Sequence, residues 1–174
     1  MAILSVIIAP DPRLKVKSDP VERVDAALRK LMDDMLETMY DAPGVGLSAI
    51  QVGVPKRVIV VDATRPDEER APHRLVNPEL LWTSGETVVI DEGCLSFPDL
   101  YAEVERPAAI TVRYRDEHNE DRELDAEGLL ARCIQHEMDH LEGVLFIDYL
   151  SAVRRNIILR KLSKARKAKE RKSA

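Results

Sequence analysis

A short run of metal-binding residue types is the feature that most restricts how this chain can fold. His136, Glu137 and His140 form an H-E-x-x-H pattern inside a stretch whose apolar residues recur at helical spacing. Residues four apart lie on one face of a helix, so the two imidazoles can bind one metal ion while Glu137 stands beside it as a base. The fold must therefore bury this helix face and bring a further ligand to it from elsewhere.

The third ligand is expected upstream, because the chain has few candidates downstream. The acids beyond the motif are Glu142, Asp148 and Glu170, and no further histidine follows. Glu142 comes only two residues after His140, so it is expected to point elsewhere. Cys94 follows Gly93, which permits a turn and close backbone approach. We therefore predict a site formed by Cys94, His136 and His140, with one coordination position left open.

Charge divides the chain into an acidic body and a basic tail. Residues 151–174 contain ten lysines and arginines and one acid, whereas residues 1–150 contain sixteen basic and thirty acidic side chains. We predict a catalytic metallohydrolase domain over 1–150, with 151–174 as a basic C-terminal helix and tail of the same domain. A tail of this sign is attracted to nucleic-acid phosphates, which repel the acidic body.

The chain is expected to be cytoplasmic and to have no membrane segment. The apolar residues 1–10 lack a basic leader and are stopped by Pro10, Asp11 and Pro12. The cysteines, Cys94 and Cys133, are too few for a disulfide framework and suit a reducing compartment.

Hydrophobic periodicity predicts an α+β fold without βαβ alternation. Helices are expected at 21–40, with a methionine-rich stripe in the core, at 125–143, and at 151–169. Strands are expected at 57–62, 86–90 and 108–115, followed by a hairpin turn at 116–121. The predicted architecture has mostly antiparallel strands packed around a central helix that carries the H-E-x-x-H motif, plus an N-terminal and a C-terminal helix.

Three segments together resemble the peptide deformylase family. They are Gly44-Val45-Gly46-Leu47-Ser48-Ala49-Ile50-Gln51, Glu92-Gly93-Cys94-Leu95-Ser96, and Gln135-His136-Glu137-Met138-Asp139-His140-Leu141-Glu142-Gly143. The similarity extends from about Ile7 to the end of the chain. This resemblance implies hydrolysis of the N-formyl group from the initiator methionine of new polypeptides, with release of formate.

The resemblance also implies roles for individual residues. Cys94, His136 and His140 bind one divalent ion, Fe(II) in the native enzyme, with Zn(II), Ni(II) or Co(II) able to replace it. Glu137 takes the proton of the attacking water and later delivers it to the leaving amine. The Gln51 amide, the Leu95 backbone N–H and the metal stabilise the charge on the formyl oxygen.

Substrate binding is likewise inferred from the resemblance. Val45 and Gly46 are expected to pair with an extended peptide, because glycine admits another chain closely. Leu129, Arg132 and Cys133 lie on the helix face before His136, which in the family lines a mainly apolar methionine pocket. A plain turn after the first helix is the alternative for the glycine segment.

Three positions depart from the family pattern. Arg132 stands where relatives commonly have an apolar or small residue, so we expect its guanidinium at the rim of the pocket or simply at the surface. Ser48 replaces the usual alanine, without an expected effect on activity. Tyr101 occupies a position where some relatives have an arginine, so peptide beyond the second residue is held differently.

Other interpretations remain open for the motif and for the tail. The motif match could be accidental, and a buried cysteine often packs as a small hydrophobe. A peptidase with a cysteine ligand would hydrolyse unformylated peptides. A structural metal domain with an RNA-binding tail would need a fourth ligand, yet His73 and His118 lie in polar, turn-like stretches.

The expected partners are a formyl-methionyl nascent peptide and, through the basic tail, the ribosome. A solvated helix end is the alternative for the tail. We expect no DNA or membrane partner and a monomeric protein.

Overall fold

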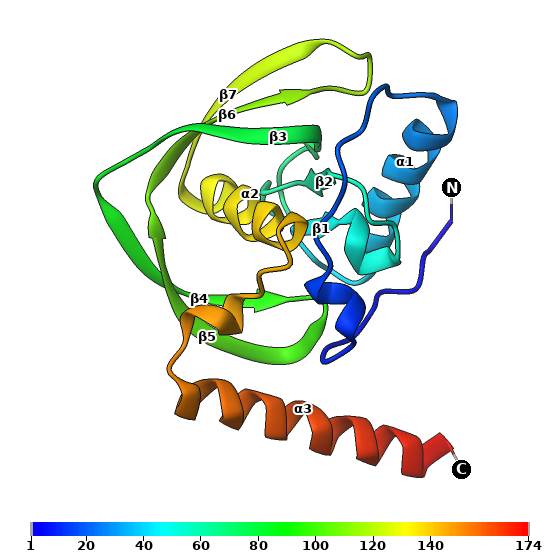
Figure 1. Cartoon of the computed structure of the whole chain (residues 1–174), viewed down its shortest axis with the longest axis vertical. Helices are drawn as coiled ribbons and strands as arrows, with labels where there is room; N and C mark the ends of the chain where they lie inside the picture. Colours follow the sequence, from blue (N-terminus) through cyan, green and yellow to red (C-terminus); the bar gives the residue numbers. More distant parts are fainter. Residues whose placement is uncertain (1, 174) are drawn as a thin grey trace.

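The computed structural model describes residues 2–173 and has the predicted α+β architecture, with antiparallel strands curved around a central helix (Figure 1). The helices are α1 (Ala26–Asp41), α2 (Gly128–Leu141) and α3 (Ala152–Ser173), with short 3-10 helices η1 (Pro12–Lys15), η2 (Ala49–Val52) and η3 (Phe146–Tyr149). The strands are β1 (Gly46–Ser48), β2 (Val58–Val61), β3 (His73–Thr83), β4 (Thr87–Cys94), β5 (Phe97–Pro107), β6 (Ala109–Arg115) and β7 (Asp121–Glu127).

The strands form two sheets, and both are antiparallel. A five-stranded sheet has the order β1-β2-β3-β6-β7, while β4 and β5 form a second, two-stranded sheet. The predicted strands at 57–62, 86–90 and 108–115 correspond to β2, β4 and β6, and the predicted turn connects β6 to β7. The helix α2 lies between the two sheets, where its apolar side packs on β2 and β6.

The first helix begins later than predicted because of its N-terminal cap. The Asp25 side chain accepts a hydrogen bond from the Leu28 backbone N–H at 2.8 Å, so the helix starts at Ala26 instead of residue 21. The methionine-rich stripe is confirmed as core, since Met32, Met35 and Met39 are fully buried.

The central helix also begins later than predicted. Residues 125–127 complete β7, in which Asp125 pairs with Thr111 of β6, and Gly128 then turns the chain at a φ of +61°. Pairing with β6 satisfies the backbone of this segment, and tertiary contacts therefore override its helical pattern. The motif residues themselves lie within α2, as predicted.

Strands β3, β5 and β7 and the short β1 were not predicted. In β5, Glu103 and Glu105 face solvent while Val104 and Arg106 are buried, a mixture of charges that hides the alternation of a strand. The pairing of β5 with β4 along almost its whole length is what orders it.

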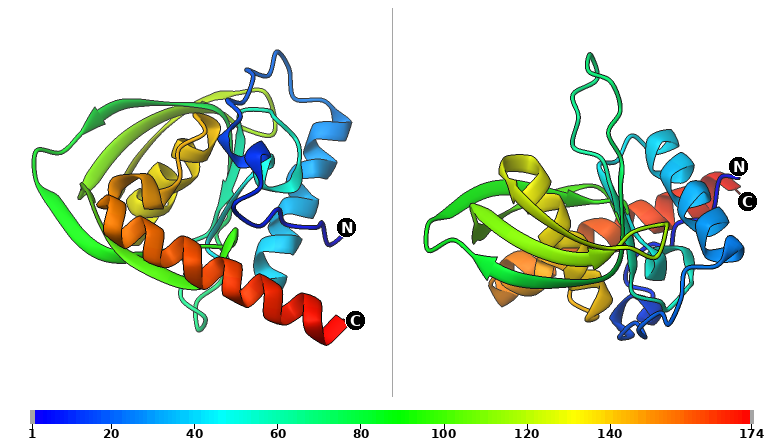
Figure 2. Two further views of the ribbon diagram at one scale, coloured as in Figure 1. Left: turned by 60° about the horizontal axis from the view of Figure 1, so that its bottom comes forward. Right: turned by 90° about the horizontal axis from the view of Figure 1, so that it is seen from above.

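The last helix lies outside the main body, below β5 in the view of Figure 1. Ile158 and Leu162 are buried against an apolar cluster that includes Phe97 and Phe146. The segment between β2 and β3 extends away from the rest of the molecule (Figure 2, right). None of the helices formed by residues 2–173 has the length and apolar character needed to cross a membrane.

Candidate metal centre and active site

The structure brings Cys94, His136 and His140 together. Their ligand atoms all lie within 4.8 Å of one another, and the Cys94 sulfur is 3.4 Å from Nε2 of His140. Both histidines project from one face of α2, as their spacing of four requires. Cys94 arrives from the end of β4, where the pairing with β5 is irregular between Gly93 and Cys94. Such an irregularity re-aims a side chain out of the regular alternation.

Nδ1 of His136 is oriented by a buried carboxylate. Glu92 Oε2 accepts its hydrogen bond at 2.7 Å, which leaves Nε2 of the same ring free to bind a metal. Arg106 holds Glu92 through two bonds of 2.7 Å, to Oε1 and Oε2. Although burial favours the neutral acid, hydrogen bonds from Arg106 and His136 hold the pKa of Glu92 well below its usual range. Glu92 is therefore an anion that fixes the tautomer of His136.

The donor set fits a divalent transition metal. One thiolate and two imidazoles suit Zn(II) or Fe(II), and three protein ligands leave a position open for water or substrate. Burial lowers the pKa of His140 well below its usual value, so this ring is neutral, as a ligand must be. The group has three members among the described residues. Neither His73 nor His118 belongs to this group, and His118 is largely exposed.

Glu137 is the candidate base beside the ligands. It is buried, and its Oε2 atom has no hydrogen-bond partner within the part of the chain that the structure describes. Burial raises the pKa of Glu137 to about 7, which suits proton exchange near neutral pH. Gly46 lies against this side chain so closely that an added Cβ would be 2.7 Å from Oε1.

The Gln51 amide has a defined orientation. Its Oε1 atom accepts hydrogen bonds from the backbone N–H and the hydroxyl of Ser48, both at 2.9 Å. Its Nε2 atom therefore faces the other way, 3.1 Å from the Ser96 hydroxyl and 3.5 Å from the Cys94 sulfur. The N–H donors of Gln51 Nε2 therefore lie beside the metal-ligand group, where they can stabilise negative charge that develops on a bound substrate.

A cleft of about 590 Å³ opens onto this centre. Its walls include all five residues that the resemblance assigned to substrate binding: Val45, Gly46, Leu129, Arg132 and Cys133. Cys94, Leu95, His136 and Glu137 also line it. Burial raises the pKa of Cys133 to about 12, so this side chain is an uncharged thiol in the wall and not a ligand.

Tyr101 and Glu142 lie farther from the chemistry. Tyr101 is exposed at the margin of the cleft, where its ring covers Gly93. Glu142 is not part of the metal-ligand group, as predicted, and accepts a hydrogen bond from Arg57 at 2.7 Å.

The expectation for the Arg132 side chain was wrong. Its guanidinium is neither at the rim of the cleft nor at the surface, since only 7% of the residue is exposed. It donates to Glu92 Oε1 at 3.0 Å and to the backbone carbonyls of Val104, at 3.0 Å, and Val88, at 2.7 Å. The Glu92 and Val104 acceptors are buried and the Val88 carbonyl is partly buried, so the guanidinium has its partners inside the protein.

Sequence reasoning missed the role of Glu92 and of Arg106. Glu92 had a detectable signal, because it is an acid two residues before the candidate ligand Cys94, in a segment that the resemblance had already singled out. No signal in the sequence distinguishes Arg106 from the other arginines. Its importance depends on the ion pair between its guanidinium and the Glu92 carboxylate, which forms only when β4 and β5 pair with each other.

The chain is similar to known proteins along almost its whole length. The family model described as Polypeptide deformylase matches residues 3–156. The peptide deformylase of Rhizobium meliloti is 57% identical over 97% of this chain and 97% of its own length. That of Phenylobacterium zucineum is 60% identical over 97% of this chain and 99% of its own.

Solved structures have a similar fold. The crystal structure of peptide deformylase from Ehrlichia chaffeensis has a TM-score of 0.93 and 40% identity, covering 97% of this chain and 99% of that one. A structure of the peptide deformylase from the same organism in complex with actinonin has a TM-score of 0.91 and 42% identity, and the match covers 95% of this chain and 98% of that one.

Proposed function

This chain belongs to the peptide deformylase family, and on that premise we propose that it removes the N-formyl group from the N-terminal methionine of newly made polypeptides and releases formate. One observation carries the proposal. The ligand atoms of Cys94, His136 and His140 converge within 4.8 Å, beside a buried Glu137 and at the base of a cleft large enough for a methionyl side chain.

The proposed cofactor is one divalent ion held by Cys94, His136 and His140, with Fe(II) in the cell and Zn(II), Ni(II) or Co(II) as replacements in purified protein. The thiolate neutralises one charge of the ion and makes the site softer than one built from histidines alone. When bound, the ion supplies Lewis acidity that lowers the pKa of water and polarises the formyl carbonyl.

Glu137 carries the proton in this mechanism. Its unpartnered Oε2 atom can accept a proton from the attacking water, whose oxygen forms a bond to the formyl carbon. The bond between this carbon and the methionine nitrogen then breaks, and Glu137 returns the proton to the leaving amine. Formate and a free amino terminus result, and the carboxylate is ready for the next cycle.

The remaining residues stabilise charge and hold the peptide. Negative charge develops on the formyl oxygen. Its proposed donors are Nε2 of Gln51, which in the free protein donates to Ser96 and lies 3.5 Å from the Cys94 sulfur, and the backbone N–H of Leu95. The methionine side chain packs on Leu129 and Cys133 in the cleft, and the peptide backbone extends along Val45 and Gly46.

A formate-release assay tests the function. Formyl-Met-Ala should be deformylated, and Met-Ala-containing peptides without the formyl group should remain intact. Glu137→Gln, which keeps all three ligands, should bind metal and lose at least about a hundredfold in turnover. Cleavage of unformylated peptides would favour a peptidase, while metal binding without any turnover would favour a structural metal site.

We also propose that the protein is a cytoplasmic monomer that contacts the ribosome, but not DNA or membrane, through α3. Ile158 and Leu162 anchor this helix, while its basic side chains, apart from the half-buried Arg155, are exposed. A helix with this charge is suited to ribosomal RNA, and the binding should weaken steeply with salt.

Charge substitution tests this contact better than deletion, because deletion would remove the two buried anchors. Changing Lys164, Lys167 and Arg171 to glutamine removes three exposed charges from one side of α3. Co-sedimentation with ribosomes should fall severalfold while formate release stays unchanged.

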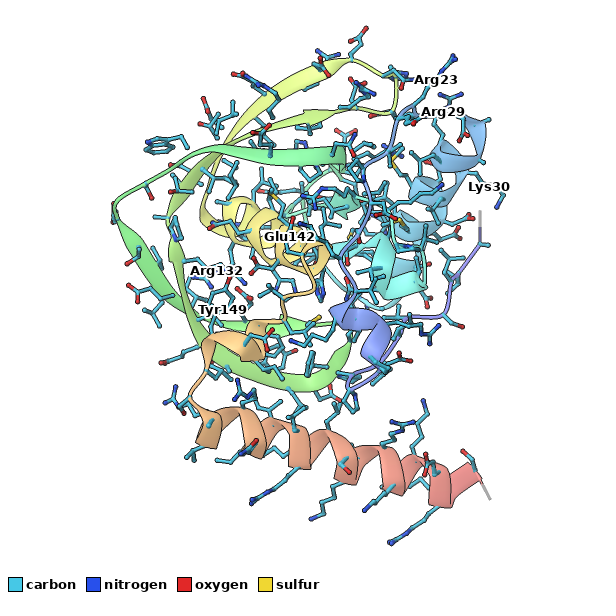
Figure 3. All side chains as sticks on the ribbon, viewed as in Figure 1. Arg23, Arg29, Lys30, Arg132, Glu142 and Tyr149 are labelled. Carbon is cyan, nitrogen blue, oxygen red and sulfur yellow. The ribbon has the colours of Figure 1, made fainter. Side chains whose placement is uncertain are left out.

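The matched control changes three exposed basic residues near α1, Arg23, Arg29 and Lys30, to glutamine (Figure 3). This variant should co-sediment like the parent protein. Equal co-sedimentation of the two triple variants would refute a contact through α3.

A further inference from the structure

Arg132 is a buried cation whose role is not explained by packing alone. It lies one helical turn before His136 on α2, and its guanidinium has three acceptors at 2.7–3.0 Å. All three belong to the neighbouring two-stranded sheet: the Glu92 carboxylate and the Val88 carbonyl in β4, and the Val104 carbonyl in β5. Arg132 therefore joins α2 to the β4–β5 sheet (Figure 3).

These are the two parts of the structure that supply the metal ligands. Cys94 is the last residue of β4, while His136 and His140 lie on α2. A metal centre requires its ligands within about 0.5 Å of the productive geometry, held by groups that are themselves fixed. A bond network between helix and strand therefore determines whether the sulfur stays in reach of the two imidazoles.

Glu92 is the centre of that network, and Arg132 completes it. Oε1 accepts hydrogen bonds from Arg106 and Arg132, and Oε2 accepts them from Arg106 and His136. Each oxygen thus has two donors, which matches the capacity of a carboxylate. With every position filled, the carboxylate has one orientation, and so does the ring of His136 that it binds.

We infer that Arg132 is a positioning residue of the metal centre: it holds Glu92 and β4 against α2, so that Cys94, His136 and His140 remain at ligand distance from one another. This inference rests on the proposed function only in assigning the metal to these three residues. An apolar side chain at this position would remove the bonds that join α2 to the Val88 and Val104 carbonyls, and it would leave Glu92 with one guanidinium instead of two.

Metal affinity is the direct measurement. Apo-protein is titrated with Zn(II) against a chelator, and with Co(II) while the visible spectrum reports the ligand geometry. Loss of a residue that orients a metal ligand typically weakens affinity by about 10–100-fold, which is the expectation for Arg132→Ile. The cobalt spectrum of this variant should differ from that of the parent protein, and Arg132→Lys should restore both properties in part.

Arg57→Ile is the matched control. Arg57 also binds an acid at one end of α2, donating to Glu142 at 2.7 Å, but within residues 2–173 its side chain has no hydrogen bond or ion pair with a metal ligand or with a residue that Arg132 binds. Its removal should leave zinc affinity and the cobalt spectrum unchanged, although thermal stability can fall in both variants. A purely structural role for Arg132 would lower the melting temperature without changing metal affinity or spectrum.

Parent-like zinc affinity and cobalt spectrum in Arg132→Ile would overturn the inference. If that variant does not fold, the Arg132→Lys variant is measured instead. A zinc affinity weakened threefold or more, together with an altered cobalt spectrum, supports the inference. Parent-like zinc affinity and cobalt spectrum refute it. Formate release by the parent protein is measured separately. A parent that binds metal in an Arg132-dependent way but releases no formate would reject the proposed function and leave this inference standing.

Discussion

Replacing Gly46 with alanine tests whether the exact position of Glu137 governs catalysis. An added Cβ would lie 2.7 Å from Oε1, 2.9 Å from Cγ and 3.1 Å from Cδ of Glu137. Ordinary van der Waals contact begins near 3.4 Å, so the carboxyl group must move by about 0.7 Å. The backbone of Gly46 does not require a left-handed conformation, so strain there does not confuse the result.

The expected consequence is a large loss of activity with a small loss of stability. Displacement of a catalytic group by about 1 Å can cost roughly a hundredfold in rate. Gly46→Ala should therefore reduce kcat/KM for formyl-Met-Ala by about 100-fold in the formate-release assay. Zinc content should stay at the parent value because the three ligands are unchanged.

Two other glycines provide controls. At Gly85 an added Cβ has no atom within 4 Å, so Gly85→Ala should behave like the parent protein. At Gly44 the nearest atom, 2.9 Å away, is the flexible end of Leu95, which can move without displacing its backbone N–H. The activity loss should thus be smaller for Gly44→Ala. A folded, metal-loaded Gly46→Ala protein within threefold of the parent would refute the reasoning.

Three further perturbations have defined outcomes. Gln51→Leu should reduce kcat by about two to three orders of magnitude, and unchanged turnover would remove this amide from the mechanism. Ser48→Ala removes one of the two hydrogen bonds to Oε1 of Gln51, a net loss of about 1 kcal/mol. We therefore expect kcat to fall about fivefold, whereas the sequence alone predicted no effect of this hydroxyl on activity. Equal kcat values for the variant and the parent protein would support the prediction from sequence. Metal added to apo-protein at about a hundred times its Kd should raise the melting temperature by roughly 5–10 °C in calorimetry, and the absence of a shift would argue against a site in the folded state.

Local patterns in the sequence were enough to identify the elements that carry the ligands. His136 and His140 are four residues apart on one helix, so the H-E-x-x-H pattern alone predicts that their side chains lie on the same helix face. Cys94 was found by a different kind of reasoning, the elimination of downstream candidates together with a flanking glycine. The structure places its sulfur among the ligand atoms of that helix.

The bounds of the helices and strands could not be predicted from the sequence as accurately as the site residues. Residues 125–127 follow a helical pattern but pair with β6, and β5 has charges that obscure its alternation. In both cases the backbone hydrogen bonds of a distant strand decide the conformation, and sequence periodicity contains no information about that partner.

The sequence by itself determined which residues can carry the chemistry, because spacing along a helix and the residue types of a metal site are local properties. Only the tertiary structure decided how that chemistry is held in place. Glu92, Arg106 and Arg132 are three charged residues from separate elements, and the Glu92 carboxylate pairs with both guanidinium groups in the interior. These ion pairs exist once β4, β5 and α2 have packed together, and no single segment of the chain encodes them.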